Sequence, residues 1–336
     1  MGIKGLTKTI SKYSPDAIEC ENLYKLSGKK VAVDASLIIY QQLLKSPKGK
    51  VFKNTEGKIT NHITGLFYKI MNYISLNIDL IFIFDGKPPD NKQDCINLRK
   101  EKSQKAKDAA DKCSSIEEKE QYEKLSLRIT KEMIDDTKKL LSLIGISYIH
   151  PEYGEGEAYA SELCRIGYVD YVLTEDMDTM AYGCPLLIRN CIDKKLKRKD
   201  IVSIFSYQKL IDGLGITHEQ FLDFCILCGC DYCPVVPKVG NVTALKLIKK
   251  HNTIENVFSE NQNKYNFPNS YLDLVNGAKN NFKSLKGNLT INDLNIVSSQ
   301  RDIDNLRSYL INEIEMNTKK VENTLKKFHN NYKSIF

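Results

Sequence analysis

Acidic side chains recur in this 336-residue chain directly after short apolar runs. Asp34, Asp85 and the pair Asp176 and Asp178 each follow such a run, and the runs are typical of buried strands. Because the carboxyl ends of parallel strands meet at one edge of a sheet, we expect these carboxylates to gather there. Divalent cations would relieve their mutual repulsion, and oxygen ligands favour Mg²⁺ or Mn²⁺ over zinc. Two such ions about 3.5–4 Å apart are the usual arrangement for hydrolysing a phosphodiester.

Two further acidic motifs lie at predicted helix ends. Glu155 and Glu157 lie in Gly154-Glu-Gly-Glu-Ala158, where a helix begins, and Asp231 follows a helix. A single acid at such a position commonly caps a helix by accepting hydrogen bonds from its first N–H groups. Capping does not explain why Asp-x-Asp and Glu-x-Glu pairs recur, so the pattern favours a metal-binding cluster.

The segment Asp176-Met-Asp178-Thr179 allows a second interpretation. A strand followed by Asp-x-Asp-Thr is also the nucleophile motif of haloacid dehalogenase-type phosphatases, which attack phosphate through Asp. That interpretation leaves Asp34, Asp85 and the Glu-x-Glu pair unexplained. It stays open as an alternative of a different class, as does a DNA-binding scaffold without catalysis.

The elements that carry these acids alternate between strands and helices. This alternation predicts an α/β fold with a central, largely parallel (mixed) sheet flanked by helices. The expected strands are 30–33, 80–84, 146–149 and 171–173; helices are expected at 35–44, 62–76, 136–143 and 221–228, and a hairpin from 186 to 205.

The stretch 92–135 differs from the rest of the chain, because it is dense in Lys and Glu, poor in apolar residues and free of Gly and Pro. It predicts a helical arm that projects from the body and has little to pack against. Beyond residue 261 the chain is rich in Asn, Lys and Ser, with helical patterns at 302–317 and 319–328.

The composition, 42% hydrophobic and 27% charged, is that of an ordinary globular protein. No apolar run approaches the roughly 18 residues of a membrane span, and the N-terminus lacks a secretory signal. Leu6 stands where a myristoylation signal needs Ser or Thr. We therefore expect an intracellular protein. The net charge of +7 includes an acid-free basic stripe at 238–251, which fits a polyanionic partner as well as a solvated surface.

Four of the ten cysteines form a C-x-x-C-x-C-x-x-C pattern that could suggest zinc or an iron–sulfur cluster: Cys225, Cys228, Cys230 and Cys233. They lie within nine residues, with no loop between the pairs to surround an ion, and the first two fall in an apolar helix. Free Cys is a normal core residue there, so we expect reduced structural thiols.

Six blocks of the chain resemble, in order, the signature of the eukaryotic and archaeal flap endonuclease family. They are Met1-Gly-Ile-Lys-Gly-Leu6, Val33-Asp-Ala-Ser36, Phe84-Asp-Gly-Lys-Pro-Pro89, Glu155-Gly-Glu-Ala158, Thr174-Glu-Asp-Met-Asp178 and Cys228-Gly-Cys-Asp-Tyr-Cys233. The resemblance implies a structure-specific nuclease that cuts 5′ flaps near the single-strand/double-strand junction and has 5′→3′ exonuclease activity. It implies two Mg²⁺ ions, replaceable by Mn²⁺, with metal-binding acids at Asp34, Asp85, Glu155, Glu157, Asp176, Asp178 and Asp231.

The resemblance also assigns roles to residues outside the acids. The arm at 90–135 corresponds to a helical arch, in which Lys92 and Arg99 would reach the scissile phosphate as catalytic residues. Their spacing of seven is two helical turns, which places both on one face. Gly2 would lie near the site, and Tyr40 would stack on a base at the cleavage point, with a core tyrosine in the helix 35–44 as the alternative.

The duplex-binding segment, a helix–two-turn–helix at 217–255, departs from the family pattern. Lys238 replaces the first glycine of its Gly-Ile-Gly motif, and Val242 and Thr243 replace the usual basic pair. Gly240 remains, and phosphate contacts are expected at Lys238 and Lys246. The departure leaves K⁺ binding there open.

The remaining expectations concern organisation and partners. We expect a single nuclease domain over 1–336 with a C-terminal helical extension at 261–336, acting as a monomer on branched DNA. No sliding-clamp motif is visible near the C-terminus, and the basic run Lys194–Lys199 fits a hairpin surface better than a nuclear import signal. Location in the nucleus is expected, or at a cytoplasmic replication site for a viral member. A 5′ exonuclease or a Holliday-junction resolvase of the same superfamily stays open.

Overall fold

The computed structural model describes residues 2–45, 52–113, 115–193, 195–196, 198 and 200–333, with side chains to residue 328. The chain forms two compact units, each built from separate stretches of sequence. Unit 1 comprises Met1–Lys25, Asp85–Cys95 and Glu152–Leu294, and unit 2 comprises Leu26–Phe84, Ile96–Pro151 and Asn295–Phe336. Lys194, Lys197, Lys199 and the last three residues lie outside the described ranges, so the predictions that concern them stay predictions.

The strands of unit 1 follow the order β1-β7-β6-β5. They are β1 (Ile18–Asn22), β5 (Tyr171–Leu173), β6 (Leu186–Asn190) and β7 (Ile201–Ser206). β7 is antiparallel to both of its neighbours, and β5 runs parallel to β6. The expected hairpin is thus confirmed, whereas β1 was not predicted. Glu19 is exposed and the other residues of β1 are half-buried, as an edge position allows.

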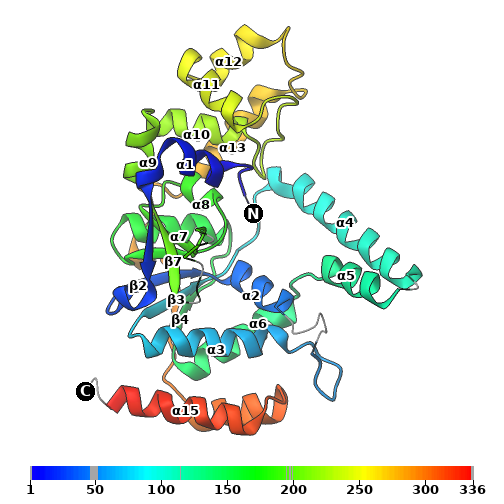
Figure 1. The fold of residues 1–336 in the computed structure, drawn as a ribbon, viewed down its shortest axis with the longest axis vertical. Helices are drawn as coiled ribbons and strands as arrows, with labels where there is room; N and C mark the ends of the chain where they lie inside the picture. The colour runs from blue at the N-terminus through cyan, green and yellow to red at the C-terminus, as the bar shows by residue number, and fades with distance from the viewer. Residues whose placement is uncertain are drawn as a thin grey trace. The chain divides into compact units, whose positions relative to one another are not determined.

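Unit 1 contains eight α-helices in the described ranges, and one of them begins with a capping box. They are α1 (Leu6–Tyr13), α7 (Gly156–Arg165), α8 (Asp178–Ala181), α9 (Tyr207–Leu214), α10 (His218–Leu227), α11 (Asn241–His251), α12 (Ile254–Asn261) and α13 (Tyr271–Lys283), with short 3₁₀ turns at Pro15–Ala17, Asp90–Lys92 and Ile291–Asp293. Thr217 and Gln220 form a capping box at the start of α10. α10 buries Phe221 and Phe224, and α11 and α12 pack on it (Figure 1). The helices predicted for the duplex-binding segment are therefore present.

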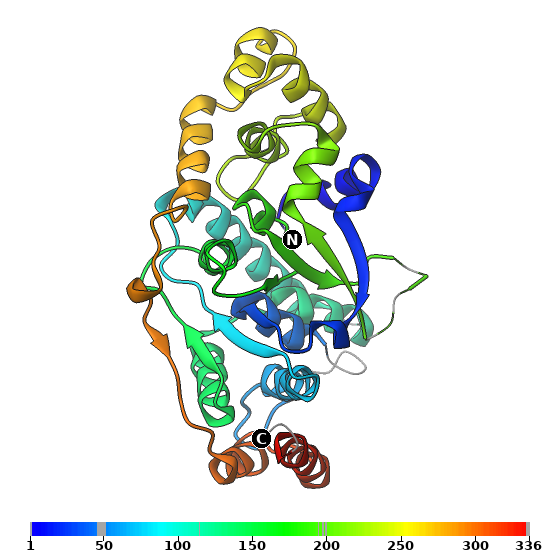
Figure 2. The same cartoon turned by 90° about the vertical axis from the view of Figure 1, so that its left-hand side faces the viewer.

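The strands of unit 2 follow the order β2-β3-β4-β8. They are β2 (Lys30–Asp34), β3 (Asp79–Ile83), β4 (Ser147–Ile149) and β8 (Ile296–Val297). The first three are parallel, and β8 adds an antiparallel edge beside β4, visible in orange beside green in Figure 2. A mixed sheet covered by helices confirms the predicted fold class.

The helices of unit 2 come from all three of its sequence stretches. They are α2 (Ala35–Leu44), α3 (Asn61–Ser75), α5 (Ile116–Ser126), α6 (Lys131–Ile144), α14 (Ile303–Ser308) and α15 (Thr318–Lys333), most of α4 (Gln93–Lys112), and a π turn at Tyr309–Glu313. α3 packs against both α2 and α15 (Figure 1). In α4 and α5, the buried side chains are those of Ala106 and Ala110. The predicted helical, little-buried arm is therefore present as two helices.

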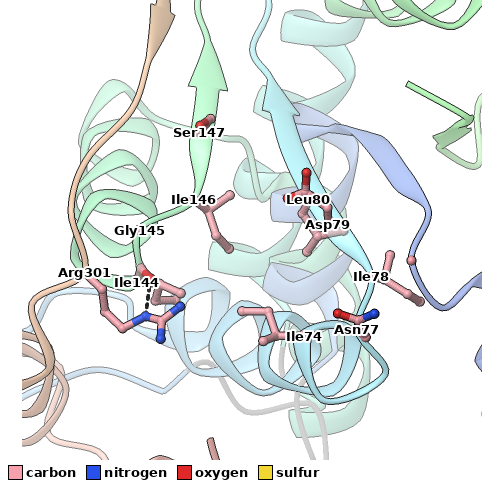
Figure 3. A pocket seen from close by; sticks show the side chains of 11 residues that line it. Ile74, Asn77, Ile78, Asp79, Leu80, Ile144, Gly145, Ile146, Ser147 and Arg301 are labelled. Atoms are coloured by element: carbon pink, nitrogen blue, oxygen red, sulfur yellow. Dashed lines mark hydrogen bonds between the residues drawn. The ribbon is translucent and has the colours of Figure 1, made fainter. Parts of the chain in front are cut away.

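A pocket of about 350 Å³ in unit 2 lies at the amino ends of β3 and β4 (Figure 3). Asp79 and Ser147 line it together with the last residues of α3 and α6, and Arg301 Nε donates a hydrogen bond to Ile144 O (3.2 Å). Asp34, by contrast, ends β2 at its carboxyl end. The pocket therefore belongs to the opposite strand ends from those that carry the predicted acids. None of the helices in the described ranges has the length and apolar character to cross a bilayer.

Candidate active site

The Asp-x-Asp motif forms a tight turn after β5. Thr174 Oγ1 accepts a hydrogen bond from the Asp176 N–H (3.1 Å), and Asp176 Oδ1 accepts one from the Asp178 N–H (3.1 Å). α8 begins at Asp178, and both carboxylates are buried. The turn therefore holds two acids side by side at the carboxyl end of a strand, as the sequence predicted.

The N-terminal segment packs directly against this pair. The Ile3 N–H donates a hydrogen bond to Asp178 Oδ1 (2.8 Å). Gly2 has a left-handed φ of +77°, and a Cβ atom there would lie 2.0 Å from Asp176 Oδ1 and 2.4 Å from Asp178 Oδ1. Only glycine fits this position, because the backbone conformation and the space both exclude a side chain. Gly2 therefore lies beside the acids, as expected from the sequence.

Asp85 lies at the start of α7. Its Oδ1 atom accepts a hydrogen bond from the Gly156 N–H (2.8 Å), the first residue of that helix, and Glu155 is the residue that precedes it. Two loops are joined here, since the Gly86 N–H donates to Gly154 O (2.9 Å). Asp85 and Glu155, which are 70 positions apart in sequence, are thereby held at one helix N-terminus, where the helix dipole favours negative charge.

Lys92 lies between two of the predicted acids. Its Nζ atom is 2.5 Å from Glu155 Oε2 and 3.2 Å from Asp231 Oδ2. The Cys95 thiol donates to the other oxygen of Asp231 (3.4 Å). Burial opposes the charged ammonium, but the charges of Glu155 and Asp231 outweigh it and hold the pKa of Lys92 above its ordinary value. Lys92 is therefore a permanent cation in an acidic cluster.

The acids of unit 1 also act on one another electrostatically. Burial, followed by the charges of Asp176 and Asp231, raises the pKa of Asp178 well above its ordinary value. Burial likewise raises the pKa of Asp176, which the Asp178 N–H partly offsets. Burial raises the pKa of Glu155, which the charge of Lys92 lowers only in part. Such desolvated, mutually repelling carboxylates are typical of a site that receives a cation.

The charge of Glu157 acts on two buried phenols, those of Tyr182 and Tyr232. The hydroxyls of Tyr182 and Tyr232 are 2.7 Å apart, and burial raises both pKa values. The charges of Glu155 and Glu157 raise them further. Six of the seven predicted acids therefore belong to one electrostatic cluster in unit 1: Asp85, Glu155, Glu157, Asp176, Asp178 and Asp231.

Asp34 belongs to unit 2, where it caps a helix. It is buried, and its Oδ1 atom accepts a hydrogen bond from the Leu37 N–H (2.9 Å) at the start of α2. The capping interpretation is thus correct for this residue. Its role as a metal ligand stays a prediction.

Four of the predicted DNA contacts are at exposed positions. Arg99, Lys238, Gly240 and Lys246 are exposed, and Tyr40 is half-buried in α2. Lys92 ends a 3₁₀ turn that runs directly into α4, which carries Arg99. Pro89, just before that turn, has an extended backbone and delays the start of the α-helix.

Lys238 adopts a left-handed φ of 67°, whereas Gly240 has an ordinary extended backbone and open space around it. The conformation that favours glycine is therefore at the position where Lys replaces it. Gly240 precedes the first residue of α11, whose N-terminus has no side-chain cap. Its lack of a side chain leaves the first N–H groups of α11 open to a ligand.

The cysteines of the C-x-x-C-x-C-x-x-C pattern are core thiols. Cys225, Cys228 and Cys233 are buried and Cys230 is half-buried. Burial raises the pKa of Cys228 and Cys233 to about 12, which favours the protonated thiol over a metal-binding thiolate.

The cluster in unit 1 fits a hard divalent cation by its chemistry, because its donors are carboxylate oxygens and a cation, Lys92, already lies among them. In the described part of the chain, no three His, Cys, Asp or Glu side chains form a ready-made metal site. Lys92 bridges Glu155 and Asp231 instead.

Comparisons with known proteins agree with this arrangement of residues. Residues 1–106 match the model of the XPG N-terminal domain, and residues 145–231 match that of the XPG I-region. Flap endonuclease 1 of Candida dubliniensis is 36% identical over 321 residues, which are 93% of this chain and 85% of the relative. The chain belongs to the flap endonuclease 1 family. Flap endonuclease 1 of Glycine max is 35% identical, covering 97% of this chain and 86% of the relative.

Two solved structures share the fold. Flap endonuclease-1 from Methanococcus jannaschii superposes with a TM-score of 0.73 at 25% identity, covering 97% of this chain and 99% of that one. The catalytic core of Rad2 in complex with DNA substrate gives a TM-score of 0.68 at 23% identity, covering 95% and 99%. The Asp176-x-Asp178 segment is therefore part of a nuclease fold, and the phosphatase alternative is set aside.

Sequence reasoning missed three contributors to the cluster: Cys95, Tyr182 and Tyr232. Tyr232 follows Asp231 directly, which was a usable signal. Cys95 is three residues after Lys92 and shares its contact with Asp231, but a cysteine in a Lys-rich arm gave no such signal.

Proposed function

We propose that this flap endonuclease 1 family member cuts 5′ flaps of branched DNA near the single-strand/double-strand junction, with 5′→3′ exonuclease activity. Family membership supports the activity, and the cluster around Lys92 supports its location on unit 1. The observation that carries the proposal is one electrostatic cluster of six acids, two of which, Glu155 and Asp231, pair with Lys92.

The acids of the cluster would hold two Mg²⁺ ions, with Mn²⁺ as a substitute and Asp34 as a further ligand. When bound, the ions would activate the attacking water and stabilise negative charge on the phosphate. Asp176 and Asp178 position the ligand oxygens through their shared turn. Lys92 leaves its carboxylate partners for the phosphate and, with Arg99, stabilises negative charge in the transition state. Potassium at 238–240 stays an open prediction.

A comparison of DNA structures tests this proposal. The full chain is incubated with a labelled 5′-flap duplex, a nicked duplex and a four-way junction, in Mg²⁺ or in EDTA. We expect Mg²⁺-dependent cutting at the flap junction, faster than on either other substrate. Preferred cutting of the four-way junction would instead identify a resolvase, and removal of single nucleotides from the nick alone would identify a 5′ exonuclease.

The proposed setting follows from the same activity. We expect a monomer on DNA, without a sliding clamp, in the nucleus or at a cytoplasmic replication site. Light scattering of the free and the flap-bound protein measures the number of chains per complex.

A further inference from the structure

The loop that carries Asp85 is joined to the loop before α7 by backbone hydrogen bonds. The Lys87 N–H donates to Glu152 O (2.9 Å), and the Gly154 N–H donates to Lys87 O (2.9 Å). Lys87 and Tyr153 form an isolated parallel bridge between the two loops. The backbone that carries the Lys87 and Tyr153 side chains is therefore held in place by hydrogen bonds between the two loops.

Tyr153 exposes its ring on this rigid support. The side chain is 58% exposed, although a large aromatic residue is usually buried. The Tyr159 hydroxyl donates to Tyr153 O (3.1 Å), which fixes the backbone and leaves the ring outside. The Lys87 ammonium lies 5.8 Å from the centre of the ring, within cation–π range. An aromatic face and a cation are thus presented together.

This pair lies immediately beside the acids. Lys87 is two residues after Asp85, and Tyr153 is two residues before Glu155. Asp85 is bonded to the Gly156 N–H, so both loops end in the same part of the cluster. A group bound on the ring would therefore lie close to the acidic cluster.

We propose that Tyr153 and Lys87 form a stacking platform for one base of the DNA strand next to the scissile phosphate. This inference rests on the proposed nuclease function. The Tyr153 ring stacks on the base, and the Lys87 ammonium pairs with a neighbouring phosphate. Every base has a flat π face, so the contact tolerates any sequence, as a structure-specific nuclease requires. Neither residue takes part in the chemistry; both position the strand.

Fluorescence of 2-aminopurine tests the platform. The analogue is placed singly at each nucleotide within three positions of the cleavage site of a 5′ flap, and Ca²⁺ replaces Mg²⁺ to prevent cutting. With the wild-type protein we expect quenching at one position. Tyr153→Ala abolishes it at that position alone, and Tyr153→Phe, which keeps the ring, retains it. Tyr24→Ala is the matched control, because Tyr24 is also exposed, at 60%.

Cleavage in Mg²⁺ gives a second readout. We expect Tyr153→Ala to lower kcat/KM about ten-fold, within the range of one lost base stack. Lys87→Ala should reduce the salt dependence of flap binding by about one phosphate contact. Suppose that the wild type cuts flaps and that Tyr153→Ala shows the same 2-aminopurine quenching and the same cleavage rate as the wild type. The proposed stacking platform is then wrong. If the wild type does not cut, the proposed function itself has failed.

Discussion

The Lys92 ammonium lies 2.5 Å from Glu155 Oε2 and 3.2 Å from Asp231 Oδ2, so a cation of the chain itself neutralises part of the acidic cluster. On the proposed function, a divalent ion held by these carboxylates would displace the lysine from them. The displaced ammonium would then be available for a phosphate. The ion pair would thus couple metal binding to the readiness of Lys92 for catalysis.

Replacing Lys92 separates its two roles. Without the ammonium, Glu155 and Asp231 repel their neighbours, so Lys92→Ala should unfold at a lower temperature in EDTA than the wild type. Mg²⁺ should stabilise the variant more than the wild type, because it replaces a missing charge. Flap cleavage should fall about 10²–10³-fold, as for the loss of one group that stabilises the transition state.

Lys279→Ala is the matched control for this experiment. Lys279 is also partly buried between two acids, 2.7 Å from Asp223 and 2.8 Å from Glu255. Mg²⁺ should stabilise this variant no more than the wild type. Equal stabilisation of both variants by Mg²⁺ would contradict a special role for Lys92.

A methyl group at position 2 should disable the site. In Gly2→Ala the added Cβ would lie 2.0 Å from Asp176 Oδ1, so the N-terminal segment or the carboxylate must move. A displacement of about 1 Å can reduce the rate about 10²-fold. Gly28→Ala is the control, since Gly28 has a similar φ of +75° and no atom within 4 Å of its Cβ position. Comparable flap-cleavage rates for the two variants would refute the account.

The raised pKa values of the acids predict how stability depends on pH. The folded chain keeps protons on Asp178 and Glu155 to higher pH than the unfolded chain does. In the absence of metal, stability therefore falls as the pH rises from about 4 through the raised pKa values. Asp178→Asn should be more stable than the wild type at neutral pH and should lose flap cleavage.

Urea unfolding between pH 4 and 7.5 in EDTA measures this effect. Asp273→Asn, at an exposed acid of the same unit, should follow the wild-type pH dependence. An Asp178→Asn variant that is less stable than the wild type at pH 7 would show that its charge stabilises the fold.

Replacing Lys238 by glycine should raise the stability of the fold and weaken duplex binding. Its φ of 67° is unfavourable for a residue with a side chain, so Lys238→Gly should gain roughly 1 kcal/mol of stability. The same change removes a predicted phosphate contact and should lower the salt dependence of duplex binding by about one contact. Lys246→Ala should lower the salt dependence without a gain in stability, because Lys246 lies within regular α11.

The sequence predicted most of the fold because hydrophobic runs and caps are local signals. The run ending at Phe84 became β3, and the helix stopped by Gly145 is α6, in which Gly145 has a φ of 83°. β1 was missed because its pairing partner, β7, is far away in sequence, with Cys20 opposite Ser203. β8 has only two residues, too few for a pattern.

The sequence was sufficient to name the acids of the site, but not to predict which residues their side chains contact. Carboxylates after strand ends gave Asp176 and Asp178, whose mutual geometry depends on a local turn. The partners of Lys92 are 63 and 139 positions away, so tertiary packing decides them. The residue type of Asp34 also does not reveal whether it acts as a helix cap, as a metal ligand or as both.

Flap cleavage by Asp176→Ala tests the central claim that the acidic cluster drives phosphodiester hydrolysis. The rate of cutting a labelled 5′ flap is measured in Mg²⁺ for the wild type and the variant, and flap binding is measured in Ca²⁺. We predict that the wild type cuts near the junction, whereas Asp176→Ala binds the flap nearly as tightly without cutting it. Cutting by Asp176→Ala at the wild-type rate would contradict the account.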